Sequence, residues 1–161
     1  MSLRLLPLAI FVLALAGCQT PVANPVAADR TPEYFPTQMK ADPPLPFSEA
    51  VRVGDMLYLA GQLGTVPGTA TVVPGGIGPE TRQLLENIKA VLERHGSSLD
   101  HVVKCTVFLA DIKEWPAFNE TYRQYFTKNL PARSALGSSG LARSARVEVE
   151  CIAWIPPKAA P

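Results

Sequence analysis

The strongest constraint on the fold is one amphipathic helix that the sequence predicts over residues 79–95. Its apolar residues recur at helical spacing and form a single stripe: Leu84, Leu85, Ile88, Val91 and Leu92. Pro79 suits the first helical position, Glu80 suits the positive end of the helix, and Gly96 suits the stop after it. A helix with one apolar stripe must bury that stripe against another element. The flanking segments must therefore supply that surface.

Strand patterns lie on both sides of this helix. The runs AVRV and MLYLAGQ flank Gly54 and Asp55, a pair typical of a two-residue hairpin turn. A loop rich in glycine and proline leads from the hairpin to the helix. The run VVKCTVFL follows the helix and predicts a strand with these residues on one face: Val103, Cys105, Val107 and Leu109.

The last part of the domain predicts a second helix and two more strands. The helix starts near Pro116 and buries one aromatic set: Phe118, Tyr122, Tyr125 and Phe126. The strands lie around Ser134–Ser138 and Arg146–Ile155. The order β-β-α-β-α-β-β predicts an α+β fold, with a single sheet and two helices packed on one face.

The N-terminal residues have the composition of an export signal. Arg4 precedes an apolar run that is too short to span a bilayer comfortably, and the run ends in small residues. Residues 15–18, Leu-Ala-Gly-Cys, resemble the bacterial lipobox, which implies lipidation of Cys18 and an outer-membrane location on the periplasmic side, since Gln19 follows. An ordinary buried apolar helix is the alternative. Removal of residues 1–17 would leave 14 basic and 14 acidic residues.

The remaining chain divides into three predicted segments. Residues 18–42 form a tether, because repeated prolines interrupt any periodic pattern there. Residues 43–157 form the folded domain, and residues 158–161 form a short tail. A near-neutral domain of this kind has no charge field that favours nucleic acid.

Several motifs of the domain, in one order, resemble the Rid (reactive intermediate deaminase, YjgF-type) family. They are LYLAGQ, TRQLLENIKAVLERHGSSLDHVVKCTVFLAD, FNETYRQYF, PARSAL and VEVECIAW, and they extend from about Phe47 to Trp154. The resemblance implies a chorismate-mutase-like fold and a homotrimer with ligand pockets between subunits. It also implies hydrolysis of enamines and imines, such as 2-iminobutanoate and 2-iminopropanoate, to 2-oxo acids and ammonia.

The resemblance also implies roles for four residues. Arg133 would bind the substrate carboxylate, as the only obvious cation for it, and Glu148 would orient water and relay protons. Gly61 would bring backbone close to the ligand, and Asn119 would line the pocket. Each has a structural alternative: Arg133 as a salt bridge between subunits, Glu148 as a strand residue beside a subunit contact, Gly61 for sheet curvature, and Asn119 for a loop contact.

The chain departs from the best-known family members at two pocket positions. Ala135 stands where they have cysteine, and Phe47 stands where they have tyrosine. The losses of a thiol and a hydroxyl leave rate and substrate range open more than reaction class. The chemistry requires no cofactor and no metal, because an iminium is already electrophilic.

The other reactive side chains have structural explanations in the sequence. Cys105 and Cys151 lie among valines, so core packing is expected, although an oxidising periplasm would permit a bridge between them. His95 and His101 are expected at the surface. Three functions therefore compete: an exported imine deaminase, a non-catalytic trimer that binds a small ligand or protein, and an endoribonuclease. The near-neutral charge and the lack of a catalytic histidine pair oppose the last.

Overall fold

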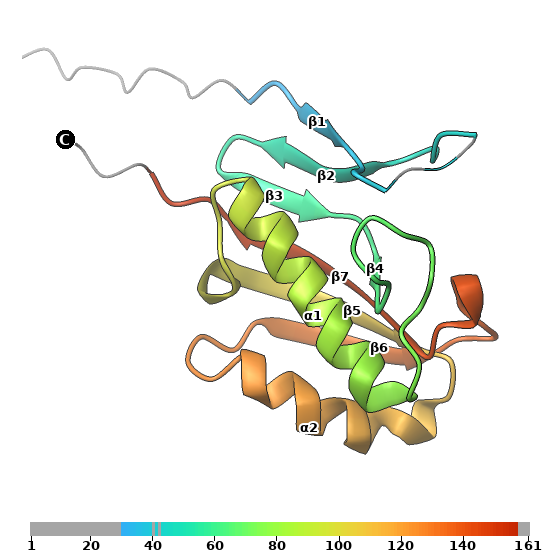
Figure 1. The fold of residues 1–161 in the computed structure, drawn as a ribbon. Helices are drawn as coiled ribbons and strands as arrows, with labels where there is room; N and C mark the ends of the chain where they lie inside the picture. The colour runs from blue at the N-terminus through green and yellow to red at the C-terminus, as the bar shows by residue number, and fades with distance from the viewer. Residues whose placement is uncertain (1–29, 40, 42, 158–161) are drawn as a thin grey trace, which may run out of the picture.

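The computed structural model describes residues 30–39, 41 and 43–157, which form one mixed sheet with two helices on the same face (Figure 1). The predicted α+β class, a chorismate-mutase-like single sheet covered by two helices, is confirmed. The helices are α1 (Ile77–Arg94) and α2 (Trp115–Tyr125). The strands are β1 (Glu33–Pro36), β2 (Ser48–Val53), β3 (Met56–Leu59), β4 (Gln62–Leu63), β5 (Val102–Leu109), β6 (Ala132–Gly137) and β7 (Val147–Trp154).

The strand order is β1-β2-β3-β7-β5-β6, with β4 paired to β7 off this path. The predicted hairpin joins β2 to β3, and Gly54 in its turn has a φ of 58°, which favours glycine. Strands β5 and β7 pair antiparallel along almost their whole lengths. Strand β6 runs parallel to β5, and α2 lies on the connection between them. The central strand β7 thus carries Glu148, and the edge strand β6 carries Arg133.

Helix α1 confirms the amphipathic pattern. All five stripe residues are buried against the sheet, and Gly96 follows the helix with a φ of 80°. The helix begins at Ile77, two residues before the predicted proline start. In α2, Phe118 and Tyr122 are buried, and Phe126 is buried just after the helix, whereas Tyr125 is only half-buried.

Two sequence predictions about strands are corrected. Val103 was expected on the buried face of its strand, but the pairing of β5 with β7 shifts between Val102 and Lys104. This bulge turns Val103 outward, and its side chain is exposed. Residues 33–36 were placed in the proline-rich tether, yet they form β1 and pair with β2. The ordered domain therefore begins before residue 43.

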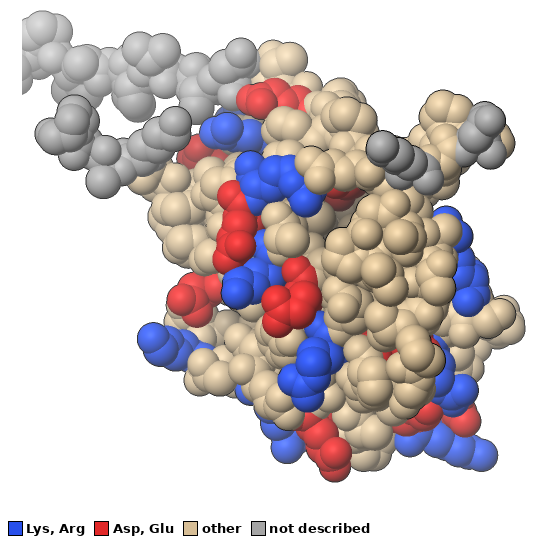
Figure 2. All heavy atoms as spheres, in the orientation of Figure 1, with Lys and Arg blue, Asp and Glu red and all other residues tan. Residues whose placement is uncertain are grey.

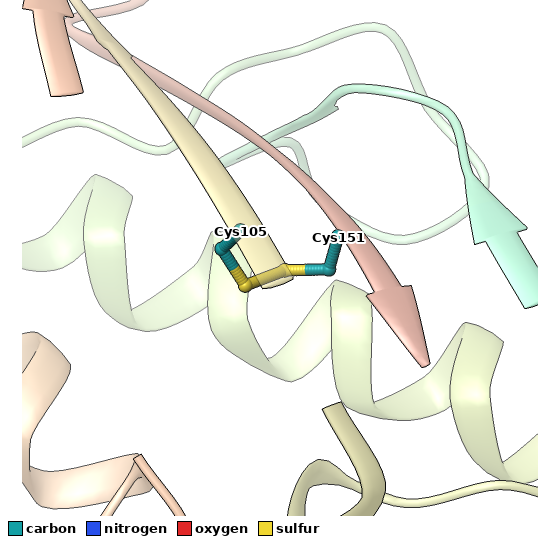
Figure 3. The surroundings of a disulfide bond; sticks show 2 residues. All are labelled: Cys105 and Cys151. Carbon is teal, nitrogen blue, oxygen red and sulfur yellow. A yellow bond between two sulfur atoms is a disulfide. The ribbon is translucent and has the colours of Figure 1, made fainter. Parts of the chain in front are cut away.

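Cys105 and Cys151 form a disulfide between β5 and β7 (Figure 3). The two residues are direct partners in the strand register, and their Cα atoms are 4.2 Å apart. Both are buried in the core beneath the helices. The sequence predicts apolar packing at these positions and leaves a disulfide between them as an alternative. In the structure the two cysteines are packed in the core and also form a disulfide.

Candidate functional site

Arg133 lies on β6 and points to the helical side of the sheet. It is the register partner of Cys105 on β5, whose side chain is buried on that side. Its Nη2 donates a hydrogen bond of 2.8 Å to Asn119 Oδ1 on α2. Its Cζ lies 4.4 Å from the ring centroids of both Trp115 and Tyr122. These contacts fix the guanidinium in place, and most of its N–H donors are directed away from Asn119.

The guanidinium borders a hollow of about 1050 Å³, which we call the Arg133 hollow. Asn119 and Ala135, two other residues predicted for the pocket, line the same hollow. So do Lys113 and Arg123, and in the described part of the chain no carboxylate lines it. Arg133 is therefore not the only cation near this site. No motif in the sequence singles out Lys113 or Arg123.

Tyr122 forms part of the floor of the Arg133 hollow. Burial raises the pKa of its phenol to about 12, although the nearby Arg133 charge acts in the opposite direction. Among the described residues its hydroxyl has no hydrogen-bond partner. The phenol is therefore neutral near pH 7, and the face of its ring packs against the Arg133 guanidinium.

Glu148 lies on β7 and borders a second hollow of about 370 Å³, which we call the Glu148 hollow. Its carboxylate packs against the backbone of Gly61, just after β3. A Cβ atom at residue 61 would lie 2.9 Å from Glu148 Cδ and would overlap its Oε1. A side chain at residue 61 would therefore displace the end of the Glu148 side chain. Phe47 lines the same hollow.

The environment of Glu148 favours the protonated form more than water does. Partial burial, and then the charge of Glu150 two residues along β7, raise the pKa of the Glu148 carboxyl above its ordinary value. A carboxylate with a raised pKa is a stronger base, and this suits a group that accepts a proton from water.

The two hollows separate the predicted site residues into two groups of three. Arg133, Asn119 and Ala135 are on the helical side of β6 and α2. Glu148, Gly61 and Phe47 line the other hollow, and Glu148 shares the helix-free face of β7 with Glu150. A single chain does not bring Arg133 and Glu148 to one ligand.

His95 corrects another prediction, because it is not a surface residue. Its Nε2 is 2.9 Å from Oε1 of the buried Glu49, and its side chain is only 10% exposed. Arg94 donates to the same Glu49 oxygen at 2.6 Å, and Phe35 of β1 stacks on the His95 ring. The sequence could not show this cluster, because its members come from β1, β2 and the end of α1, which meet only in the folded domain.

Comparisons with known proteins agree with this fold. Residues 37–155 match the family described as Endoribonuclease L-PSP. A RutC family protein of Pyrococcus horikoshii is 42% identical over 122 residues, which are 76% of this chain and 97% of that protein. A 2-iminobutanoate/2-iminopropanoate deaminase of Capra hircus is 44% identical over 67% of this chain and 79% of its own. The crystal structure of RidA from the Antarctic bacterium Psychrobacter sp. superposes with a TM-score of 0.70 at 34% identity, covering 76% of this chain and 99% of that one.

The fold defines an α+β protein with two helices on one face of a single mixed sheet. The chain belongs to the Endoribonuclease L-PSP family, the YjgF/Rid family that its motifs resemble. Across the described residues, no group of three or more His, Cys, Asp or Glu side chains could hold a metal ion. None of the helices described is long and apolar enough to cross a bilayer. Residues 1–29, with the predicted signal and Cys18, lie outside the described part.

Proposed function

We propose that this protein is an imine/enamine deaminase that hydrolyses reactive 2-imino acids to 2-oxo acids and ammonia. The observation that carries the proposal is the division of six predicted pocket residues, four that match the family and two that depart from it, into a cationic hollow and a carboxylate hollow. One hollow suits the substrate carboxylate and the other suits the attacking water. The deaminases of goat and other mammals among the similar proteins support the same reaction class.

The reaction requires few groups from the protein. Arg133 binds the substrate carboxylate through charge-assisted hydrogen bonds, while Asn119 and the rings of Trp115 and Tyr122 hold the guanidinium. Water adds to the iminium carbon and gives one proton to Glu148. That proton passes to the nitrogen of the tetrahedral adduct, and the C–N bond breaks. Ammonia leaves, and the proton of the adduct's hydroxyl group goes to the departing ammonia or to water as the carbonyl forms. Glu148 ends in its starting state.

The site needs a second copy of the chain, and we propose the homotrimer that the resemblance implies. Arg133 of one subunit would face Glu148 of the next. The helix-free face of the sheet offers apolar surface for such a contact, with Tyr58, Leu136 and Trp154 all exposed. An edge and a face left open in one subunit are commonly covered in a symmetric assembly.

We further propose export and anchoring through lipidated Cys18, on the periplasmic side of the outer membrane. The lipobox-like residues 15–18 and the disulfide between Cys105 and Cys151 both support this location. Disulfides persist in the periplasm and are rare in the bacterial cytosol.

The alternative functions have weaker support. A binding protein without turnover is favoured only by Ala135 and Phe47, which replace a thiol and a hydroxyl in the pocket. An endoribonuclease would need a basic surface for RNA, but basic and acidic side chains alternate over the helical face (Figure 2).

The decisive experiment is ammonia release by the full-length protein, purified in mild detergent, from imines that an amino-acid oxidase generates in situ. Release above the spontaneous rate is expected, and Arg133→Ala should abolish the excess. An inactive wild type that still binds 2-oxo acids through Arg133 would replace the deaminase with the binding protein.

A further inference from the structure

The Glu148 hollow is larger than the attacking water alone requires. Its volume of about 370 Å³ lies within the range of small-molecule pockets, roughly 300–1,000 Å³. Four large apolar side chains line it, Met39, Leu45, Phe47 and Leu63, together with Ala142 and with the polar side chains of Thr37, Glu49, Gln62, Thr65 and Arg143. Three of the four large apolar residues precede the second strand. Only Phe47 of these four is a predicted pocket residue.

The chain just before the second strand is held to the domain at several points. The backbone N–H of Gln38 donates to Glu49 Oε2 at 3.4 Å, and Glu49 is itself bound by Arg94 and His95. The Arg143 guanidinium contacts Met39 Sδ at 3.6 Å. These contacts hold Gln38 to β2 and Met39 to the turn before β7.

Arg143 also contacts the loop before α1. Its Nη1 donates to the carbonyl of Ala70 at 3.2 Å. Arg143 and Ser144 have φ values of 60° and 56°, a conformation that non-glycine residues adopt at an energetic cost. Arg143 lines the Glu148 hollow, so this costly conformation occurs at the edge of the hollow.

The shape of a 2-imino acid determines which group enters this hollow. Its reacting carbon carries the carboxylate and the side chain in different directions. If Arg133 of one subunit holds the carboxylate and Glu148 of the next orients the water, the side chain extends away from Arg133, along the wall next to Glu148. That wall includes the apolar side chains of Met39, Leu45 and Leu63.

We propose, on the basis of the proposed function, that the Glu148 hollow is a side-chain pocket that selects 2-imino acids with extended aliphatic side chains. Met39, Leu45 and Leu63 are its specificity-determining residues. Phe47, in place of tyrosine, removes a hydroxyl that would otherwise require a polar partner in the same wall.

The expected selectivity follows from burial of the side chain. Each methylene removed from water favours binding about fourfold. The leucine-derived side chain has three more carbons than that of alanine, so full burial would favour it by about sixtyfold. Because the hollow is partly open, a preference of at least about tenfold is expected.

The test compares two substrates and two ligands on the full-length protein in detergent. The kcat/KM for the imines of leucine and of alanine is measured, and binding of 4-methyl-2-oxopentanoate and of pyruvate is measured by calorimetry. The double variant Met39→Ala/Leu45→Ala should reduce the ratio of the two kcat/KM values to within about threefold of one, because it shortens the wall. Val66→Ala, an exposed residue outside both hollows, should leave the ratio unchanged.

Each outcome separates the inference from the proposed function. Turnover of both imines with equal efficiency would overturn the side-chain pocket and leave the deaminase. Preferential binding of 4-methyl-2-oxopentanoate without turnover of either imine would support the pocket and overturn the deaminase. A double variant that keeps the wild-type preference would overturn the assignment of Met39 and Leu45. Absence of both turnover and binding would overturn both proposals.

Discussion

Gly61 and Glu148 form the most tightly coupled pair in the candidate site. The sequence placed both in the pocket through separate motifs and offered sheet curvature as the alternative for Gly61. The structure gives a local reason for the glycine: the Glu148 carboxylate occupies the space that a side chain at residue 61 would fill. Contact between residues so far apart in the chain depends on the pairing of β4 with β7.

Gly61→Ala should lower kcat by at least about tenfold, because the added methyl displaces a group that contributes about 10²–10⁴-fold. The measurement is imine hydrolysis at saturating substrate. Gly78→Ala is the matched control, since a Cβ there meets open space in the first turn of α1. It should leave kcat unchanged and stabilise the fold by about 0.5–1 kcal/mol. Equal activity of the two variants would disprove the coupling.

The raised pKa of Glu148 predicts a specific pH dependence. As the pH falls through that pKa, Glu148 becomes protonated and cannot accept a proton. The kcat/KM should therefore decline in acid with a midpoint above the ordinary glutamate value of 4.5. Glu148→Gln should lower kcat by about 10²–10⁴-fold and abolish this decline. A decline retained in Glu148→Gln would assign it to another group.

The same pKa sets the sign of the stability effect. Because the folded-state pKa is raised, the contribution of Glu148 to stability is full below the unfolded pKa and is lost as the pH rises through the folded one. At pH 7 the ionised carboxylate therefore opposes folding. Glu148→Gln should accordingly show a melting temperature no lower than the wild type, which separates lost catalysis from lost structure.

At the scale of elements, the sequence predicted what periodicity can encode. The helical stripe of α1 and the hairpin at Gly54 were confirmed, because each depends on side chains close together in the chain. The bulge at Val103 and the strand β1 were missed. A bulge leaves the alternation of VVKCTVFL intact, and EYFP between prolines has too few apolar residues to indicate a strand; only the neighbouring β2 makes it one.

The disulfide joins two central strands and closes a separation of 46 residues. In the chain-entropy account, a loop of this length contributes at most about 4 kcal/mol to the free energy of unfolding. Cys105→Ala/Cys151→Ala should therefore lower that free energy by about 2–4 kcal/mol in urea unfolding. A reductant should destabilise the wild type alone. Equal effects of the reductant on both proteins would show that the two sulfurs are not bridged in solution.

At the scale of the whole molecule, the fold and the site differ in how far sequence could predict them. Motif order identified the family, and the family model confirms it over residues 37–155. The sequence named the site residues but not their grouping, because strand parity and pairing decide which face each occupies. Their separation into two hollows appears only when β6 and β7 are placed in one sheet.

The proposed anchor concerns the N-terminal part of the chain. Cys18→Ser should move the protein from the membrane fraction to the soluble periplasmic fraction, because the acceptor thiol for the lipid is lost. Intact mass measurement of the N-terminus is the direct check on the wild type. An unmodified Cys18 in the wild-type protein would contradict the lipoprotein hypothesis and would not affect the proposed imine chemistry.

The proposed trimer predicts that two inactive variants can complement each other. Arg133→Ala and Glu148→Gln should each be nearly inactive as pure proteins. If every site uses Arg133 of one subunit and Glu148 of another, a mixed trimer contains some sites with both groups intact. With random mixing in equal amounts, about a quarter of all sites regain both, so co-expression should restore about a quarter of wild-type activity. The two chains carry different tags, and the mixed trimers isolated through both tags should have one intact site in three, or about a third of wild-type activity. Isolated mixed oligomers without activity above that of either variant would place both residues in one subunit and contradict the separation of the two hollows.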